Sequence, residues 1–129
     1  MIEANAEWKK NLQVNVKVRQ FEVDVDEPPQ FHGDDTGMMP TELFISSLAS
    51  CFCMALVFVA KKKRINFEDM TVKVNAEADK EHLRYSKMTV TVASSLSNNN
   101  LEPLIEQAKK YCYVTNTISQ CCPIEYAIG

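Results

Sequence analysis

The sequence predicts an α+β fold with the element order βββ-α-ββ-α-β. Apolar and polar residues alternate with a period of two in several short segments, and residues 43–60 form one long segment without a charged residue. The 129 residues, 46% of them hydrophobic, have the size and composition of one globular domain. Because no repeat, low-complexity run or linker divides the chain, we expect a single domain over residues 1–129.

Alternation near the amino terminus predicts three antiparallel strands, each with one apolar and one polar face. Proline has no N–H group for a strand ladder, so Pro28 and Pro29 mark the end of the third strand. A loop that contains Gly33 and Gly37 then leads to the first helix. The apolar positions are Ile2, Ala4, Ala6 and Trp8, then Leu12, Val14, Val16 and Val18, then Phe21, Val23 and Val25.

The first helix is expected from residue 40 to about residue 64. Pro40 suits a first helical turn, Glu42 suits the positive end of the helix dipole, and the basic run 61–64 suits the negative end. Residues 43–60 leave no polar face, so other parts of the protein must enclose the helix. One small chain offers too little surface for that, and we therefore expect a homodimer with a long buried central helix.

A membrane-spanning helix is the alternative for this segment. Residues 43–60 cover about 27 Å in a helix, close to the thickness of a bilayer core. Amphipathic strands on both sides and three serines within the segment, at positions 46, 47 and 50, favour a central helix between two sheets. We therefore expect no membrane contact.

The second half of the sequence predicts a hairpin, a helix and a last strand. Residues 72–78 and 83–92 alternate around a turn near residues 79–81. Apolar residues at helical spacing from Leu101 to Cys112 predict an amphipathic helix with Cys112 on its buried face. Alternation at positions 124, 126 and 128 predicts a closing strand.

Charge and the amino terminus narrow the class of protein. A net charge of −3 does not favour a general nucleic-acid binder, so we expect a small molecule or a second copy as the partner. The first residues lack the basic and apolar regions of a signal peptide, which predicts a cytoplasmic protein. In that reducing compartment the five cysteines are better explained as thiols for catalysis or packing than as disulfides.

The cysteine spacings separate these thiols. Cys51 and Cys53 lie about 200° apart around a helix, so one site cannot use both. Cys121 and Cys122 are adjacent and point to opposite faces of an extended chain. Even with His32 and His82 the set lacks the spacing of a zinc site, and we expect no metal. Packing is the simplest role for the three cysteines at positions 53, 121 and 122.

Three segments resemble the OsmC/Ohr family of thiol-dependent peroxide reductases: residues 33–43, Leu48-Ala49-Ser50-Cys51-Phe52, and residues 110–115. The resemblance implies an OsmC-like fold and an intertwined homodimer without metal or organic cofactor. It also implies that the Cys51 thiolate attacks a hydroperoxide, that the sulfenic acid condenses with Cys112 to a disulfide, and that an external dithiol reduces this disulfide.

In the Ohr branch of the family an arginine from the loop after the first strand activates the thiol, held by a glutamate that Glu42 matches. This sequence lacks an arginine in that turn, and its candidate cations are Lys9, Lys10 and Arg19. Glu42 also has a plainer role as an acidic residue in a first helical turn. Met38-Met39 in place of Pro-Asn, and Tyr113 in place of proline, indicate an OsmC-like branch with its own substrate.

Two functions follow from these residues. The first is reduction of organic hydroperoxides, with hydrogen peroxide as a further candidate substrate, in oxidative-stress defence; Cys51, Cys112 and Glu42 favour it. The second is a non-catalytic dimer that binds a small ligand or senses redox state. The missing arginine favours this second function.

Overall fold

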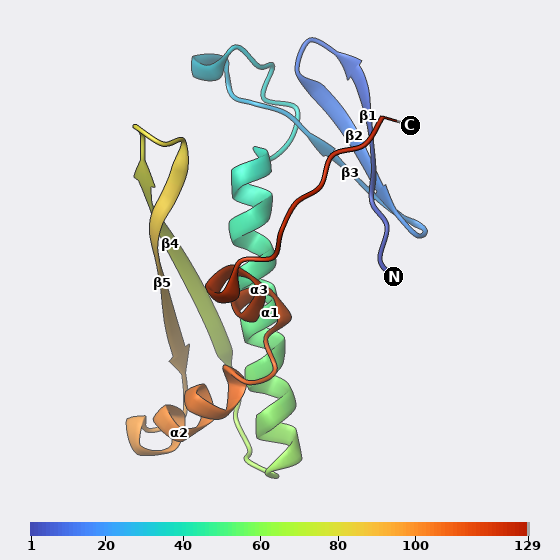
Figure 1. Ribbon diagram of the computed structural model, residues 1–129. Helices are drawn as coiled ribbons and strands as arrows, with labels where there is room; N and C mark the ends of the chain where they lie inside the picture. The colour runs from blue at the N-terminus through green and yellow to red at the C-terminus, as the bar shows by residue number, and fades with distance from the viewer. Residues whose placement is uncertain (129) are drawn as a thin grey trace. The chain divides into compact units, whose positions relative to one another are not determined.

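The computed structural model describes residues 1–128 and has the α+β architecture that the sequence predicts (Figure 1). The chain forms two compact units, of which the second begins at Ile45. The elements are β1 (Asn5–Lys10), β2 (Gln13–Val18), β3 (Phe21–Val25), the short 3-10 helix η1 (Pro29–Phe31), α1 (Pro40–Lys62), β4 (Met70–Asp79), β5 (Arg84–Ser94), α2 (Asn98–Ala108) and α3 (Tyr113–Gln120).

The first unit contains the three predicted strands as an antiparallel sheet in the order β1-β2-β3. Trp8 lies opposite Val14, and Val14 lies opposite Val25, so the alternating apolar residues share one face. This unit alone does not bury that face, because the Trp8 and Phe21 side chains are 68% and 58% exposed. The alternation therefore predicted the strands and their apolar face, and the face is open to a further partner.

A buried carboxylate, Asp26, organises the loop between β3 and α1. Asp26 is only 1% exposed and accepts hydrogen bonds from the Thr36 hydroxyl at 2.6 Å and from the Thr36, Asp34 and Glu27 N–H groups. The Thr36 hydroxyl bond is the main cause that holds the pKa of Asp26 below its ordinary value of 3.8. Beside this network Gly37 lies so close to β3 that a Cβ would come within 2.1 Å of the Asp24 carbonyl oxygen. The Asp26 carboxylate and this close backbone approach together fix the loop.

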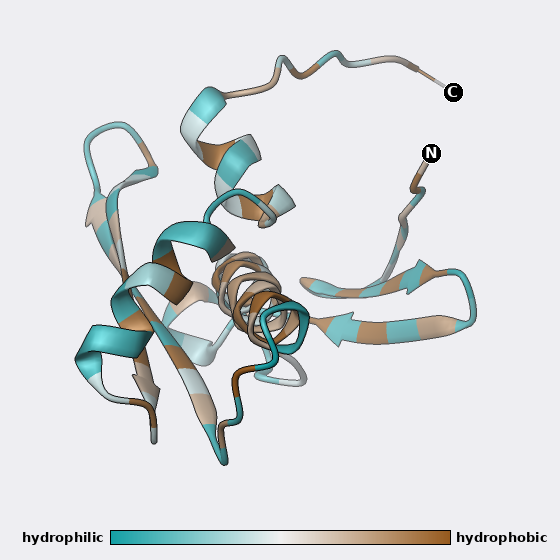
Figure 2. Ribbon diagram, turned by 90° about the horizontal axis from the view of Figure 1, so that it is seen from below, coloured by the Kyte–Doolittle hydropathy of each residue, from teal (hydrophilic) through white to brown (hydrophobic). Residues whose placement is uncertain are grey.

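The second unit surrounds one side of α1. The hairpin β4–β5 runs along the helix, α2 lies near its carboxyl-terminal end, and α3 lies beside its middle (Figure 1). The strands show the alternation of apolar and polar residues, whereas α1 is apolar along most of its length (Figure 2). The core of the second unit consists of Phe52, Ala55, Leu56, Val59, Ala60, Leu101, Leu104, Ala108 and Cys112.

The second unit by itself does not enclose α1 on all sides. Leu56 and Val59 are buried, whereas Met54 and Phe58 are 66% and 52% exposed. By length and composition α1 is also the one helix within residues 1–128 that is apolar enough to cross a membrane, a test that core helices of globular proteins pass as well. An uncovered apolar face on this helix is the feature that the dimer prediction requires.

Two predicted elements at the end of the chain were wrong. The helix expected to reach Cys112 ends at Ala108, and a separate helix, α3, follows from Tyr113. The closing strand expected at residues 124–128 does not form, and residues 121–128 have no regular secondary structure. Ile124, Tyr126 and Ile128 are exposed, and alternation alone makes no strand without a neighbouring strand to pair with.

Candidate active site

The thiols of Cys51 and Cys112 meet in the core of the second unit. Cys51 comes from α1 and is half-buried, whereas Cys112 is fully buried. A hydrogen-bonding interaction joins the two thiols. The structure therefore brings together the two cysteines that the sequence analysis paired, although Cys112 precedes α3 instead of lying on the helix expected to contain it.

Cys112 reaches this position because α2 ends early and α3 starts at once. The chain turns after Ala108, where the Tyr111 N–H donates to the Ala108 carbonyl oxygen at 3.0 Å. Cys112 is then extended, with φ −89° and ψ 101°, and its carbonyl oxygen accepts the Asn116 N–H at 3.0 Å. Cys112 is thus the residue that caps the amino-terminal end of α3.

The first turn of α3 lies against the Cys51 sulfur. The backbone N–H groups of Val114 and Tyr113 hydrogen-bond to it and act to lower the pKa of the thiol. These are N–H groups that a helix leaves without an internal partner, so α3 presents partial positive charge to Cys51. Cys51 lies too far along α1 to use the amino-terminal end of its own helix, and α3 supplies one instead.

The pKa of the Cys51 thiol is nevertheless raised overall. Desolvation by burial is the largest influence and raises the pKa of the Cys51 thiol above its ordinary value, and the neighbouring Cys112 raises it further. A cation beside the thiol is expected to act in the opposite direction. The Cys51 thiol is therefore only weakly acidic, although two backbone N–H groups are directed at its sulfur.

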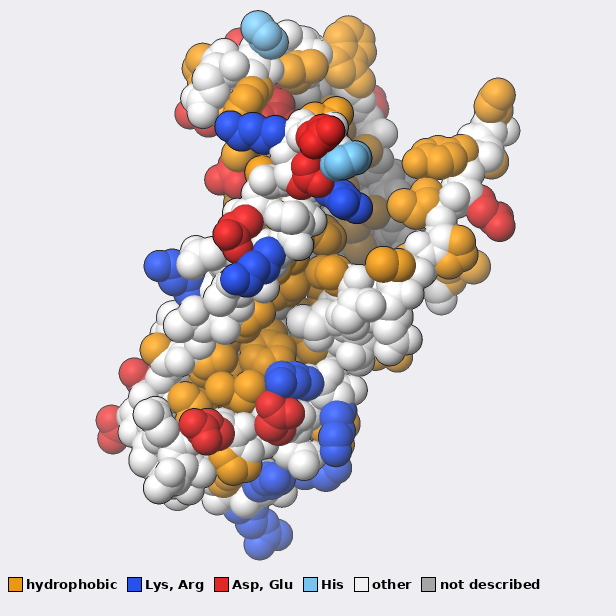
Figure 3. Space-filling model, turned by 60° about the vertical axis from the view of Figure 1, so that its left-hand side comes forward, with side chains coloured by type: hydrophobic (Ala, Val, Ile, Leu, Met, Phe, Trp, Pro, Cys, Tyr) orange, Lys and Arg blue, Asp and Glu red, His pale blue; other side chains and the backbone are white. Residues whose placement is uncertain are grey.

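An apolar cavity of about 530 Å³ lies in the second unit, and neither thiol of the pair lines it directly. Its apolar wall includes Phe52, the residue after Cys51, and its polar side includes Thr115, the residue after Val114. In Figure 3 apolar side chains line the hollowed face of the second unit. The remaining lining residues are Val90, Val92, Ile105, Lys109, Asn116 and Ser119.

The other cysteines and both histidines lie apart from the thiol pair. The Cys53 thiol donates to the Met70 carbonyl oxygen at 3.8 Å, on another side of α1, as the helical spacing predicted. Cys121 and Cys122 are exposed after α3, and His82 pairs with Asp79 at 2.9 Å. Within residues 1–128 no three His, Cys, Asp or Glu side chains cluster as metal ligands would.

Glu42 and the candidate cations belong to the first unit. Oε1 of Glu42 accepts the N–H of Met39 at 3.0 Å, which is the glutamate half of a capping box at the start of α1. Lys9 pairs with Glu7 at 3.3 Å, and the Arg19 guanidinium lies 5.1 Å from the centre of the Phe21 ring. Lys10 is exposed at the end of β1.

Comparison with solved structures supports the fold. A structure of an OsmC-like protein from Mycoplasma pneumoniae has a TM-score of 0.79 and 17% sequence identity. The match covers 94% of this chain and 89% of the Mycoplasma chain. An organic hydroperoxide resistance protein, OsmC, from Legionella pneumophila has a TM-score of 0.64 and 27% identity, covering 92% of this chain and 88% of its own.

A third structure, of an organic hydroperoxide resistance protein from Elizabethkingia anophelis, has a TM-score of 0.69 and 26% identity. It covers 91% of this chain and 87% of its own. A search of curated proteins found no match. The sequence model of the family described as OsmC-like protein matches residues 33–127, a range that includes both cysteines of the pair. This chain therefore belongs to the OsmC-like protein family.

Proposed function

We propose that this protein reduces organic hydroperoxides with Cys51 as the attacking thiol and Cys112 as the resolving thiol. The observation that carries the proposal is the contact between these two thiols in an apolar core, of which Phe52, Val90, Val92 and Ile105 also line a cavity. The names of the Legionella and Elizabethkingia relatives, at 27% and 26% identity, support the same chemistry.

The reaction uses one hydroperoxide and both thiols. The Cys51 thiolate attacks the terminal peroxide oxygen, the O–O bond breaks, and the leaving alkoxide takes a proton to become an alcohol. The sulfenic acid formed on Cys51 then reacts with the Cys112 thiol: the S–S bond forms, the S–O bond breaks, and the leaving hydroxide takes the Cys112 proton and departs as water. An external dithiol reduces the disulfide by thiol–disulfide exchange and restores both thiols.

The cavity favours an organic substrate. Its wall of Phe52, Val90, Val92 and Ile105 gains free energy by covering an alkyl or acyl chain, which hydrogen peroxide lacks. Its volume of about 530 Å³ lies within the ordinary range for small-molecule sites. We therefore expect alkyl hydroperoxides to react faster than hydrogen peroxide.

Glu42 is the proposed third residue of the site. Its Oε1 is used by the Met39 N–H, which leaves Oε2 to hold a cation for Cys51. Lys9, Lys10 and Arg19 are the candidates. Replacing Glu42 with Gln keeps an oxygen for the cap but removes the charge. Slower alkylation of Cys51 at unchanged thermal stability would support the role of Glu42 in holding a cation. Unchanged alkylation would leave Glu42 as a capping residue only.

We further propose that the protein acts as a cytoplasmic homodimer. The exposed apolar residues of α1, Met54 and Phe58, and the open apolar face of the β1-β2-β3 sheet need covering. A second copy offers the same apolar surfaces in return, which is typical of a two-fold symmetric interface.

The proposed activity is tested by following peroxide consumption with a dithiol present. We expect consumption of an alkyl hydroperoxide by the wild type, a slower reaction with hydrogen peroxide, and only background consumption by a Cys51→Ser variant. The matched control is Cys53→Ser, because Cys53 lies two residues along the same helix and contacts Met70 instead. Equal rates for wild type and Cys51→Ser would contradict the proposal.

The raised pKa of Cys51 favours an alternative function, a non-catalytic redox sensor or small-ligand carrier. A thiol that is mostly protonated at neutral pH is a poor nucleophile, which suits a redox sensor or a small-ligand carrier with slow chemistry. Stoichiometric oxidation of the thiol pair without catalytic turnover would support this alternative over the enzyme.

A further inference from the structure

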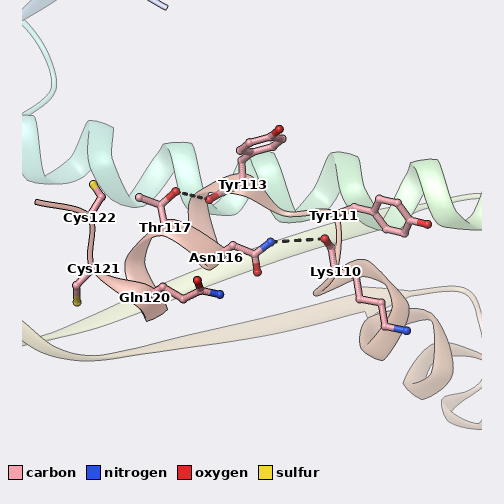
Figure 4. Close-up of a pocket in the computed structure, with 8 residues that line it drawn as sticks. All are labelled: Lys110, Tyr111, Tyr113, Asn116, Thr117, Gln120, Cys121 and Cys122. Carbon is pink, nitrogen blue, oxygen red and sulfur yellow. Dashed lines mark hydrogen bonds between the residues drawn. The ribbon is translucent and has the colours of Figure 1, made fainter. Parts of the chain in front are cut away.

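A second cavity lies along α3, on a surface that the proposed peroxide chemistry does not use. It has a volume of about 630 Å³. At one end it is lined by Lys110 and Tyr111, which precede α3, and at the other end by Cys121 and Cys122, which follow it (Figure 4). Tyr113, Asn116, Thr117 and Gln120 form the wall between the two ends.

The charge of this cavity is positive. None of its eight lining residues is acidic, and Lys110 contributes a charged ammonium group. Within residues 1–128 this ammonium forms no ion pair, whereas the neighbouring Lys109 pairs with Glu106 at 2.6 Å. An anionic group of a ligand would find an unpaired cation at this end of the cavity.

The other end carries two accessible thiols. Cys121 and Cys122 are both exposed, and the Cys121 thiol donates to the Ile118 carbonyl oxygen at 3.6 Å. Figure 4 shows the two sulfur atoms on opposite sides of the chain. They are therefore not arranged to chelate one metal ion, and each must react as a single thiol.

The distance between the two ends defines the size of the ligand. The eight residues of α3 extend over about 12 Å in a helix. An extended peptide of three residues spans about 10 Å. A tripeptide-sized molecule bonded to Cys121 or Cys122 can thus extend along much of α3 towards the Lys110 ammonium, and the polar wall offers hydrogen-bonding groups along its length.

We propose that this cavity is a site of reversible mixed-disulfide formation with a low-molecular-weight anionic peptide thiol. The oxidant is the symmetrical disulfide of that thiol. The thiolate of Cys121 or Cys122 attacks one sulfur of this disulfide, the S–S bond breaks, and one thiolate leaves while the other half stays bonded to the protein. The neighbouring cysteine points to the opposite side, so it is poorly placed to displace the adduct.

Oxidised glutathione is a suitable probe, because it is an anionic disulfide of a tripeptide thiol, and cystamine is the matched cationic disulfide. We expect peptide mapping of the wild-type protein to find the glutathione adduct on Cys121 or Cys122, formed faster than the cystamine adduct. The double variant Cys121→Ser/Cys122→Ser should lose the adduct.

A Lys110 variant tests whether the cavity recognises an anionic disulfide or whether the two thiols react only because they are exposed. Lys110→Gln should slow glutathionylation about two- to fivefold, the value of one exposed charge pair of about 0.5–1 kcal/mol, and leave the cystamine rate unchanged or faster. Lys80→Gln, in the β4–β5 turn, should change neither rate.

Three results would overturn the proposal: equal glutathione rates in wild type and Lys110→Gln, adducts on Cys51 or Cys53 instead, or only disulfides between chains through Cys121 and Cys122. The test is independent of the proposed peroxide reduction, since it needs neither peroxide nor turnover at Cys51.

Discussion

The Cys51 thiol lies against the Cys112 thiol, and the first turn of α3 directs the Val114 N–H to the same sulfur. The amino-terminal end of α3 therefore contacts both cysteines: Cys112 is its N-cap residue, and the Cys51 sulfur accepts the N–H groups of its first turn. The arrangement brings the two sulfurs of the proposed reaction together before any substrate binds. The Val114 and Tyr113 N–H groups also act against burial, which is the main cause of the raised pKa of Cys51.

Alkylation of Cys51 should depend on pH in a specific way. Burial raises the pKa of the Cys51 thiol, so the thiolate that reacts with iodoacetamide forms only above the ordinary thiol range. We expect the alkylation rate to keep rising with pH beyond the value of 9.0 that is ordinary for this group. A profile that levels off near neutral pH would show that a cation activates the thiol.

The contribution of α3 can be tested by removing one N–H group. Tyr113 occupies the first position of α3, which tolerates proline, and Cys112 before it is already extended as a residue before proline must be. Tyr113→Pro should therefore keep the helix but raise the pKa of Cys51 further and slow its alkylation at a given pH. Tyr113→Phe keeps the N–H group and is the matched control; a slower rate in that variant would assign the effect to the phenol instead.

The sequence predicted those parts of the fold in which local pattern and packing agree. Alternation at Val14, Val16 and Val18 predicted β2, and the long apolar segment with Pro40 at its start predicted α1. In each case the residues that form the element also carry its apolar face, so one pattern contains both kinds of information.

The first turn of α3 could not be predicted in the same way. Thr115, Thr117 and Val114 have low helix propensity, so this segment offers no helix signal and is stabilised by its surroundings. Without α3, the contact of Cys51 with a helix end was also invisible in the sequence. Conversely, Ile124 to Ile128 carries a strand pattern but has no neighbouring strand to pair with.

The Asp26 network should make the loop before α1 sensitive to acid. Asp26 has a lowered pKa in the folded protein, so its stabilising effect is complete above the unfolded value of 3.8 and is lost as the pH falls through the folded pKa. Asp26→Asn should reduce the free energy of unfolding at pH 7, because the amide places donors where Thr36 and Asp34 already donate.

The difference between wild type and Asp26→Asn should then shrink below about pH 4. Urea unfolding followed across this pH range measures it. Asp35→Asn is the control, since Asp35 is exposed in the same loop and already has a positive φ of 56° that asparagine accepts well. A constant difference at all pH values would exclude ionisation of Asp26 as the cause.

The proposed dimer depends on the open face of α1. Phe58→Asp places a charge on this face, where Phe58 is 52% exposed, and should shift the protein from dimer towards a particle of 14.6 kDa in light scattering. Leu83→Asp is the control, because Leu83 is 91% exposed in the hairpin turn. Wild-type protein that is already a folded monomer at micromolar concentration would exclude the dimer.

The most direct test of the account is to identify the disulfide that forms after treatment with one equivalent of alkyl hydroperoxide. We predict that mass spectrometry finds Cys51 linked to Cys112, and that Cys112→Ser instead accumulates a sulfenic acid on Cys51 that dimedone traps. Cys53→Ser should form the same disulfide as the wild type, because its thiol contacts Met70 and not the pair. A peroxide-dependent link from Cys53 to Cys121 or Cys122, with Cys51 still reduced, would contradict the assignment of the thiol pair.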